Sequence, residues 1–295
     1  MNVEQLNREF GLPKLLNFFS DDSGLILADL AGGQARLCLQ GAHLMHWQPR
    51  GQAQPVLWMS REAKPVAGKS LRGGVPVCWP WFGSRSADVP AHGYARTVLW
   101  QVVDSQPLPN GGVRLTLCWS QDAHPLWPHA CRVELRVEVG CDLRISLMTC
   151  NTGNQPLEIS EALHTYFRIS DIAAVRLHGL DGVDYWDKAA GRSELCTQDG
   201  SLSFAEETDR VYVNSAATCM LEDPGLKRRI VVEKVGSFST VVWTPWVDKA
   251  RRMGDMGEPD GWREMLCIES GNALDNTLTL LPGDRHSLQV HYQVT

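Results

Sequence analysis

The sequence lacks any apolar run long enough to form a membrane-spanning helix, and its polar start, MNVEQLNREFGL, has no apolar core of a secretory signal. Basic residues are in the minority, because 28 lysines and arginines face 34 aspartates and glutamates for a net charge of −6. Neither a nucleic acid nor an anionic membrane is therefore expected as a partner. We predict a soluble, cytoplasmic, monomeric protein. A small anionic ligand is compatible with this charge, because one pocket can be positive on a negative protein.

Motifs that hold metals or cofactors are also absent. The nine cysteines are scattered without a CxxC pair or a CxxCH motif, and no HxxxH motif occurs. We interpret the cysteines as buried free thiols of a reducing compartment rather than as disulfides or zinc ligands. The glycine pair at 32–33 does not stand between a strand and a helix, so it predicts a turn and not a dinucleotide-binding loop. No cofactor and no metal are expected.

The dominant positive signal is alternation of apolar and polar residues with a period of two. It is clearest at the four runs 113–119, 133–139, 143–147 and 288–294. Such runs have one apolar and one polar face, as strands of an antiparallel sheet do. Turn signals follow them closely, and helices are predicted only in the first dozen residues and over 246–253. The pattern predicts an all-β fold, a large antiparallel β-sandwich with a few short helices.

The chain shows no internal repeat, low-complexity tract or linker that would divide it. Its 295 residues, 43% of them hydrophobic, are enough for one large core. We therefore expect residues 1–295 to form a single domain.

Four segments interrupt the alternation because they are too polar, too aromatic or too rich in glycine for plain strands. They cover 71–83 with 92–96, 160–167, 208–212, and 243–246 with 267–272. Sugar sites need carboxylates and imidazoles for hydroxyl groups and flat aromatic faces for the C–H side of the ring. The segments supply the polar candidates His92, His164, Asp209 and Glu269 and the aromatic candidates Trp79, Trp81, Tyr94 and Trp243.

Each polar candidate also has a purely structural interpretation. His164 lies in a strand-like run and could be an ordinary buried histidine, His92 could be a loop residue, and Asp209 could form a surface ion pair or cap a turn. Glu269 is the least ordinary, because it closes the apolar run Met265 to Ile268 and a buried carboxylate costs several kcal/mol unless it is paired.

The ordered set RGGVPVCWPWFG, HGYAR, EALHTYF, TDRVY, WTPW and CIESGN resembles the aldose 1-epimerase superfamily. It is most similar to the branch of glucose-6-phosphate 1-epimerases, the hexose-6-phosphate mutarotases. The motifs extend from residue 71 to residue 272 in the expected order, so the resemblance covers nearly the whole chain. It implies the galactose mutarotase-like β-sandwich with the site in a cleft over one sheet.

The resemblance assigns roles to single positions. His164 matches the general acid and Glu269 the general base, while His92 and Asp209 match residues that bind sugar oxygens. Arg72 and Arg96 match positions that hold the phosphate. Trp243 is expected to bind substrate. One departure is Thr244, where many relatives are expected to have asparagine, and it weakens any expectation of hydroxyl contacts there.

The expected activity is interconversion of the α and β anomers of a phosphorylated hexose, with glucose 6-phosphate as the expected substrate. A carboxylate and an imidazolium can remove the proton from the C1 hydroxyl and protonate the ring oxygen, without a metal. The bidentate, permanently charged guanidinium suits a phosphate, although the two arginines could also be ordinary surface residues. Glycines next to Arg72 suggest close approach of a ligand to the backbone.

Three other functions remain open. A mutarotase of free aldoses would not need the arginines, a glycoside hydrolase would use two carboxylates, and a non-catalytic carbohydrate-binding protein would need neither His164 nor Glu269.

Overall fold

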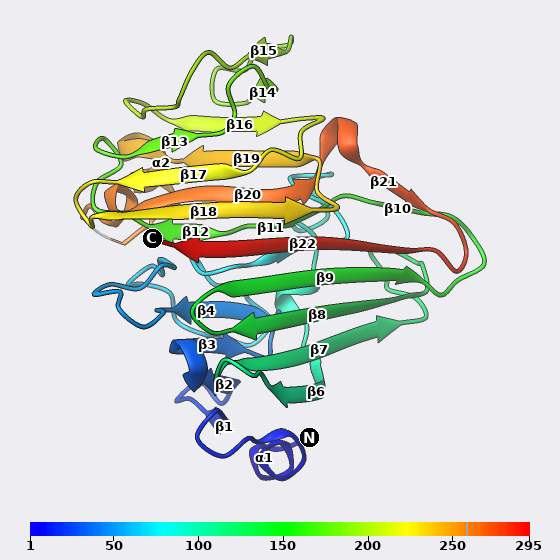
Figure 1. Cartoon of the computed structure of the whole chain (residues 1–295). Coiled ribbons are helices and arrows are strands. Elements are labelled where there is room, and N and C mark those ends of the chain that lie inside the picture. The colour runs from blue at the N-terminus through cyan, green and yellow to red at the C-terminus, as the bar shows by residue number, and fades with distance from the viewer. Residues whose placement is uncertain (258) are drawn as a thin grey trace.

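Strands are the predominant regular secondary structure of the molecule (Figure 1). The structure is a computed structural model and describes residues 1–257 and 259–295. Two eight-stranded antiparallel sheets form its body, and a four-stranded sheet lies at the N-terminal end. This is the predicted antiparallel β-sandwich, and the fold class is confirmed.

The first eight-stranded sheet, here called the site sheet, is built mainly from the second half of the chain. Its strand order is β15-β14-β16-β19-β20-β11-β5, and β12 also pairs with β20. The strands are β5 (Val77–Cys78), β11 (Glu161–Leu163), β12 (Tyr166–Arg168), β14 (Asp184–Asp187), β15 (Cys196–Thr197), β16 (Thr208–Tyr212), β19 (Ser239–Thr244) and β20 (Met265–Asn272).

The second eight-stranded sheet, the backing sheet, has longer strands in the order β13-β17-β18-β22-β9-β8-β7-β6. They are β6 (Gln101–Pro107), β7 (Val113–Gln121), β8 (Cys131–Val139), β9 (Leu143–Asn151), β13 (Arg176–His178), β17 (Cys219–Asp223), β18 (Arg228–Val235) and β22 (Arg285–Val294). The four predicted strand runs fall in β7, β8, β9 and β22, so these predictions are confirmed.

Smaller elements complete the described part of the chain. The four-stranded sheet is β1 (Leu16–Ser20), β2 (Ile26–Leu30), β3 (Ala35–Cys38) and β4 (His43–Trp47), and β10 (Leu157–Ile159) pairs with β21 (Leu278–Leu280). The helices are α1 (Val3–Phe10) and α2 (Trp246–Met253), with 3-10 turns η1 (Ala31–Gly33), η2 (Ala95–Thr97), η3 (Gly261–Glu264) and η4 (Leu274–Asn276). Both predicted helices are confirmed, and the glycine pair at 32–33 ends a 3-10 turn.

The alternating runs place one apolar face in the core. In β8, Val133, Leu135 and Val137 are buried while the residues between them face outward. One hydrophobic cluster includes buried residues of all three large sheets. We therefore propose that residues 1–295 form one domain. All nine cysteines are free and six of them are buried, among them Cys118 and Cys131, whereas Cys150 is half-buried.

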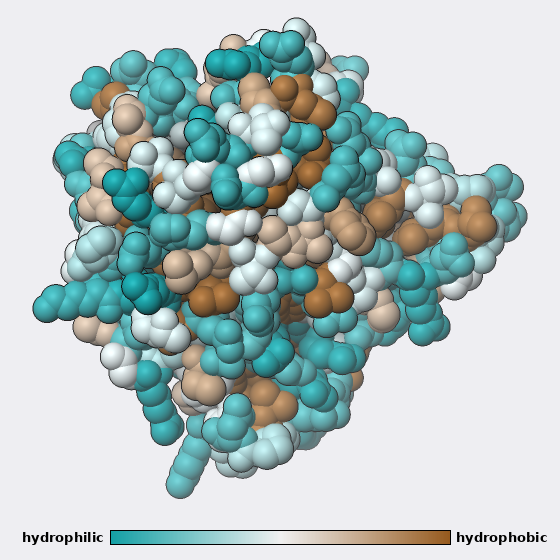
Figure 2. Space-filling view, turned by 45° about the horizontal axis from the view of Figure 1, so that its top comes forward, coloured by the Kyte–Doolittle hydropathy of each residue, from teal (hydrophilic) through white to brown (hydrophobic). Residues whose placement is uncertain are grey.

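No helix among the described residues is long and apolar enough to cross a membrane. Figure 2 shows one face of the molecule, where hydrophilic residues predominate and apolar residues lie in small, separate groups.

A buried polar network joins the site sheet to the backing sheet. Glu161 of β11 is fully buried, and its Oε1 atom lies 3.1 Å from Nε2 of His286 on β22. Asn272 of β20 donates to the same carboxylate at 3.2 Å. Burial lowers the pKa of His286, but the hydrogen bond and charge of Glu161 outweigh it and raise that pKa above its usual value.

This network should make stability depend on pH. Because the pKa of His286 is raised in the folded state, the pair stabilises the protein fully below the unfolded pKa of about 6.5. The contribution, on the order of 1 kcal/mol, is lost as pH rises through the higher folded value. Urea unfolding of wild type and His286→Gln gives the difference in their free energies of unfolding. We expect wild type to be the more stable protein, and this difference to be larger at pH 6 than at pH 8.5. A difference that stays constant with pH would contradict this account.

Candidate active site

One cavity of about 470 Å³ brings together the four polar candidates, the two arginines and one of the four aromatic candidates proposed from the sequence. A hexose phosphate fits in a pocket of this size. The seven side chains on its wall are Arg72, His92, Arg96, His164, Asp209, Trp243 and Glu269. They come from four separate segments of the chain, which the site sheet and its connecting loops bring together.

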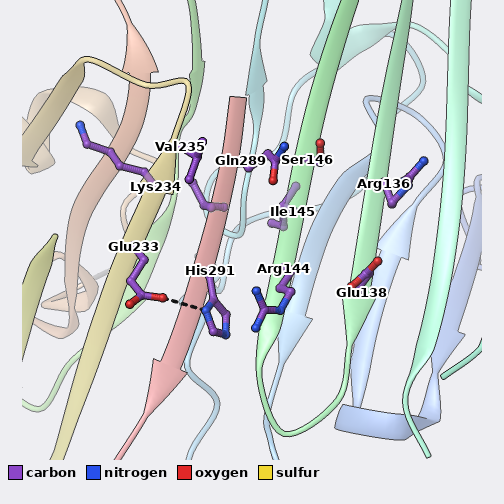
Figure 3. Close-up of a pocket in the computed structure, with 11 residues that line it drawn as sticks. Arg136, Glu138, Arg144, Ile145, Ser146, Glu233, Lys234, Val235, Gln289 and His291 are labelled. Atoms are coloured by element: carbon purple, nitrogen blue, oxygen red, sulfur yellow. Dashed lines mark hydrogen bonds and ion pairs between the residues drawn. The ribbon is translucent and has the colours of Figure 1, made fainter. Parts of the chain in front are cut away.

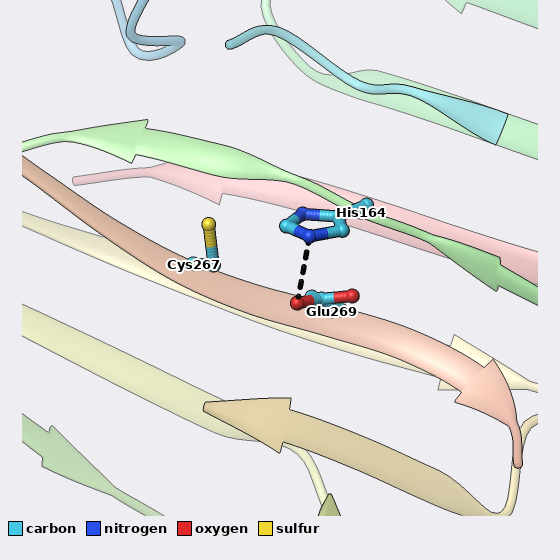
Figure 4. A group of neighbouring side chains, drawn as sticks. All are labelled: His164, Cys267 and Glu269. Atoms are coloured by element: carbon cyan, nitrogen blue, oxygen red, sulfur yellow. Dashed lines mark ion pairs between the residues drawn. The ribbon is translucent and has the colours of Figure 1, made fainter. Parts of the chain in front are cut away.

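Glu269 and His164 face each other in the interior of this cavity. Glu269 lies on β20, where it pairs with Val241 of β19, and is 1% exposed. His164 occupies the link between β11 and β12 and is 8% exposed, and its Nε2 atom lies 3.4 Å from Oε1 of Glu269 (Figure 4). The next residue, Thr165, forms a hydrogen bond of 2.6 Å with the hydroxyl of Tyr292 on the backing sheet. The side chain of His164 therefore points the other way, toward the cavity.

Each member of this pair has a polar atom without a partner. Nδ1 of His164 and Oε2 of Glu269 are buried, and no group of the described residues hydrogen-bonds to them. A buried polar atom without a partner costs free energy, roughly 1–3 kcal/mol. These two atoms are therefore available for a polar ligand that enters the cavity.

Burial and neighbouring charges favour the neutral form of both groups. Burial, followed by the charges of His92, Arg96 and Arg72, holds the pKa of His164 well below its usual value. Burial and the charge of Asp209 raise the pKa of Glu269 well above its usual value, although Arg96 opposes this. These two shifts favour Glu269 over His164 as the holder of a single shared proton. The start of ring opening is expected to need the other arrangement, with Glu269 ionised and His164 protonated.

His92 is positioned by a backbone turn that only glycine allows at the next residue. Both His92 and Gly93 have positive φ, and a Cβ on Gly93 would lie 1.9 Å from the carbonyl oxygen of Trp79. Nδ1 of His92 accepts a hydrogen bond from the Gly83 amide, and its ring lies 5.5 Å from that of His164. Burial, then Arg96 and Arg72, lower the pKa of His92 to about 4, so it is neutral near pH 7.

The two arginines differ in how far their charge is already compensated. Arg72 donates to Asp255 at 3.1 Å and to the hydroxyl of Tyr166 at 3.0 Å. Arg96 donates to the carbonyl oxygen of Ala91 at 2.6 Å and pairs with no carboxylate of residues 1–257 and 259–295. Of the two arginines, Arg96 is therefore the one whose positive charge is available to bind an anionic ligand.

The glycines beside Arg72 do not have the role suggested by the sequence. A Cβ on Gly73 would lie 2.6 Å from Cα of Met59, and one on Gly74 would lie 2.3 Å from the carbonyl oxygen of Leu44. Both glycines thus allow close packing of the chain against itself, and Arg72 is held in place by that packing.

Asp209 and Trp243 share the cavity wall with a cation that sequence reasoning missed. Lys249 of α2 lies 3.8 Å from Asp209 and 2.7 Å from Glu207, and its amino group lies 6.0 Å from the Trp243 ring centroid. Burial raises the pKa of Asp209, although the charge of Lys249 lowers it. The predicted helix over 246–253 was the only sequence signal near Lys249, and it did not indicate which sheet strand the helix would contact.

Three aromatic candidates lie outside the cavity wall, which corrects their sequence-based interpretation. Trp79 donates to Thr149, Trp81 donates to the carbonyl oxygen of Pro90, and Tyr94 bonds Gln121. All three are nearly fully buried because they fill the core beneath the segment that holds His92. Thr244 is also fully buried away from the cavity wall.

A second hollow of about 240 Å³ lies across β8, β9, β22 and β18 of the backing sheet (Figure 3). Within it, Glu233 and His291 bond each other at 2.9 Å. None of the residues proposed from the sequence lines it. Lys234, at its edge, is buried and donates to Ser239 and Thr240, and burial lowers its pKa to about 8.

Comparison with known proteins shows to which family the chain belongs. The family model described as aldose 1-epimerase matches residues 25–293. The chain belongs to the aldose 1-epimerase family. A relative from Escherichia coli K12, named provisionally as a glucose-6-phosphate 1-epimerase, is 36% identical over 92% of this chain and 89% of its own length. A similarly named protein from Salmonella typhimurium is 37% identical over 91% of this chain and 88% of its own length.

Solved structures of aldose 1-epimerase relatives have the same fold. A crystal structure of a Salmonella typhimurium protein, described provisionally as a mutarotase, matches with a TM-score of 0.87 at 32% identity, over 96% of this chain and 94% of that one. Galactose 1-epimerase of Lactobacillus acidophilus matches with a TM-score of 0.70 at 15% identity, over 95% and 98%, which shows the fold alone.

Proposed function

We propose that this member of the aldose 1-epimerase family interconverts the α and β anomers of a hexose 6-phosphate, with glucose 6-phosphate as the preferred substrate. The observation that carries the proposal is one cavity in which an apposed buried imidazole and carboxylate share the wall with two arginines. The provisional names of the relatives from Escherichia coli and Salmonella typhimurium support the same substrate.

The position of the pair suits the reaction, because both oxygens that exchange protons are bonded to C1. Glu269 takes the proton of the C1 hydroxyl while His164 protonates the ring oxygen, and the bond from C1 to that oxygen breaks. Rotation about the C1–C2 bond presents the other face of the aldehyde, and the two proton transfers then run in reverse. An acid and a base must therefore lie close together, as a separation of 3.4 Å allows.

The phosphate has a second consequence for this proton transfer. Ring opening starts with Glu269 ionised and His164 protonated, and it ends with the proton on Glu269. The protein's own groups favour the second arrangement, because burial and then the charges of His92, Arg96 and Arg72 lower the pKa of His164. A phosphate close to charge −2 beside these arginines offsets their effect and favours the imidazolium needed for ring opening.

The remaining site residues fit supporting roles. His92, Asp209 and Trp243 line the same cavity. In the proposal, His92 and Asp209 bond sugar hydroxyl groups, and Trp243 covers the C–H side of the ring. Asp255 and Tyr166 hold Arg72, and the ring of Tyr166 stacks on His164 at 4.8 Å. Arg72 is thus linked through Tyr166 to the proposed acid.

Comparison of substrates tests the proposal. The value of kcat/KM for anomer exchange should be highest for glucose 6-phosphate and lower for glucose and galactose, which lack the phosphate. Equal or higher values for the free sugars would favour a mutarotase of free aldoses. No exchange above the spontaneous rate with any of the three, although a sugar binds, would favour a non-catalytic binding protein.

The pH dependence of catalysis should respond to Arg96. We expect a bell-shaped dependence of kcat/KM on pH. On the acid side, activity falls when the pair of His164 and Glu269 binds a second proton, and on the alkaline side it falls when the pair loses its one shared proton. Arg96 lowers the pKa values of both His164 and Glu269. Arg96→Ala should therefore move both limbs to higher pH. Profiles measured with glucose 6-phosphate for both proteins would contradict the account if the limbs stayed in place or moved down.

A further inference from the structure

The proposed acid and base lie beside a third potential metal ligand that the reaction does not use. Cys267 precedes Glu269 by two residues on β20, so both side chains are on the same face of the strand. Its sulfur atom, a ring nitrogen of His164 and a carboxylate oxygen of Glu269 lie within 4.8 Å of one another, and all three residues are buried (Figure 4). Cys267 is a free thiol.

We infer that His164, Cys267 and Glu269 form an inhibitory site for zinc or a similar borderline-soft divalent cation. Three protein ligands that offer nitrogen, sulfur and oxygen, with the cavity on the remaining side, correspond to a zinc site with one open position. The imidazole and thiolate select against magnesium and calcium, which prefer oxygen ligands alone. Oε2 of Glu269 has no hydrogen-bond partner among the described residues, so the carboxylate is not saturated by protein donors.

The spacing of the ligands indicates reversible rather than structural binding. Zinc bonds of about 2.0–2.3 Å in a tetrahedron place ligand atoms roughly 3.3–3.8 Å apart. The pair His164–Glu269, at 3.4 Å, is already within this range, whereas the widest separation in the group must close by about 1 Å. Side-chain rotation of Glu269 and Cys267 can supply this movement, at some cost in affinity.

The surrounding charges also set a limit on affinity. Arg72 and Arg96 add positive charge around His164, which opposes a dication. Burial also raises the pKa values of Cys267 and Glu269 well above their usual values, so a bound ion must displace a proton from each, which lowers its affinity further. A bound ion would occupy both proposed catalytic side chains, so it should compete with the sugar. This consequence for catalysis rests on the proposed function, whereas the metal site itself does not.

Cobalt is a spectroscopic probe for the site, because a thiolate ligand gives Co²⁺ an intense near-ultraviolet charge-transfer band. Titration of the full-length protein with Co²⁺ should produce this band with one equivalent bound. The band should disappear in Cys267→Ser and in Cys267→Ala and persist in Cys219→Ser, which changes a buried cysteine of the backing sheet. Circular dichroism should confirm that each variant is folded. Absence of the band in wild type, its persistence in both Cys267 variants or its loss in Cys219→Ser would overturn the assignment.

Inhibition provides the second measurement. Zinc should raise the KM of wild type for glucose 6-phosphate without lowering kcat. Loss of an outer-shell partner lowers metal affinity roughly 10–100-fold, so loss of the direct ligand Cys267 should weaken zinc inhibition by at least this factor. The rate of each variant with zinc is compared with its own rate without zinc. Equal zinc sensitivity of Cys267→Ser and wild type would overturn the inhibitory role. If wild type showed no anomer exchange, the proposed function would fail, and the cobalt spectra would still decide whether the metal site exists.

Discussion

Glu269→Gln is expected to lower the turnover of glucose 6-phosphate anomers by roughly 100-fold or more, because the amide keeps the shape of the side chain but cannot accept the C1 hydroxyl proton. His164→Asn removes the opposite partner and should have an effect of similar size. The double variant should be little slower than the slower single variant, since the two groups act as a unit. Initial rates of anomer exchange in single and double variants measure all three effects.

Control variants separate chemistry from folding in this experiment. Glu233→Gln makes the same change on the backing sheet, outside the cavity, and should leave turnover near the wild-type value. Urea unfolding should show that Glu269→Gln is at least as stable as wild type, because the substitution removes a buried ionisable group. Among the described residues, His164 is the only ion-pairing contact of Glu269 within 4 Å. Wild-type exchange by a folded Glu269→Gln protein would exclude Glu269 as the base.

Arg96→Ala is expected to raise the KM for glucose 6-phosphate by about 30-fold or more and to change the KM for free glucose little. Removal of one partner of a charge-assisted contact with phosphate costs on the order of 2 kcal/mol of binding free energy, which corresponds to a roughly 30-fold loss of affinity. Arg96→Lys keeps the charge but loses the bidentate geometry, so it should fall between wild type and Arg96→Ala. Equal losses on the phosphorylated and the free sugar would contradict phosphate binding by Arg96.

Arg72→Ala should behave differently, because Arg72 already bonds Asp255 and Tyr166. Its removal should weaken phosphate binding less than Arg96→Ala does. It should also lower kcat, since Tyr166 stacks on the proposed acid and loses its partner. A purely binding effect of Arg72→Ala, larger than that of Arg96→Ala, would show that the unpaired charge of Arg96 is not the main phosphate contact.

The sequence predicted the strands well because burial alone determines them. Alternation in 133–139 requires one face in the core, and β8 has this face buried. Glu269 was recognisable for a related reason, since a carboxylate that closes a fully apolar run must be functional or paired. His164 and Asp209 were candidates because their segments interrupt the alternation, but their roles, and both arginines, came from the order of the motifs.

Other features of the site depend on contacts that a linear pattern does not encode. Lys249 and Asp255 reach the cavity only because the fold brings α2 and the residues after it beside Asp209 and Arg72. Trp79 resembles a sugar platform in sequence, yet the core beneath His92 needs its volume. The location of the shared proton depends on burial together with four neighbouring charged or titratable groups, all of which come from other segments.

Exchange spectroscopy of glucose 6-phosphate at anomeric equilibrium tests the central claim most directly. Magnetisation transfer between the α and β C1 protons can be followed with increasing amounts of the wild-type protein and with a chelator present. We predict an exchange rate that rises in proportion to protein concentration, exceeds the spontaneous rate and is not reduced by the chelator. A rate that stays at the spontaneous value at all concentrations of folded protein would contradict the account.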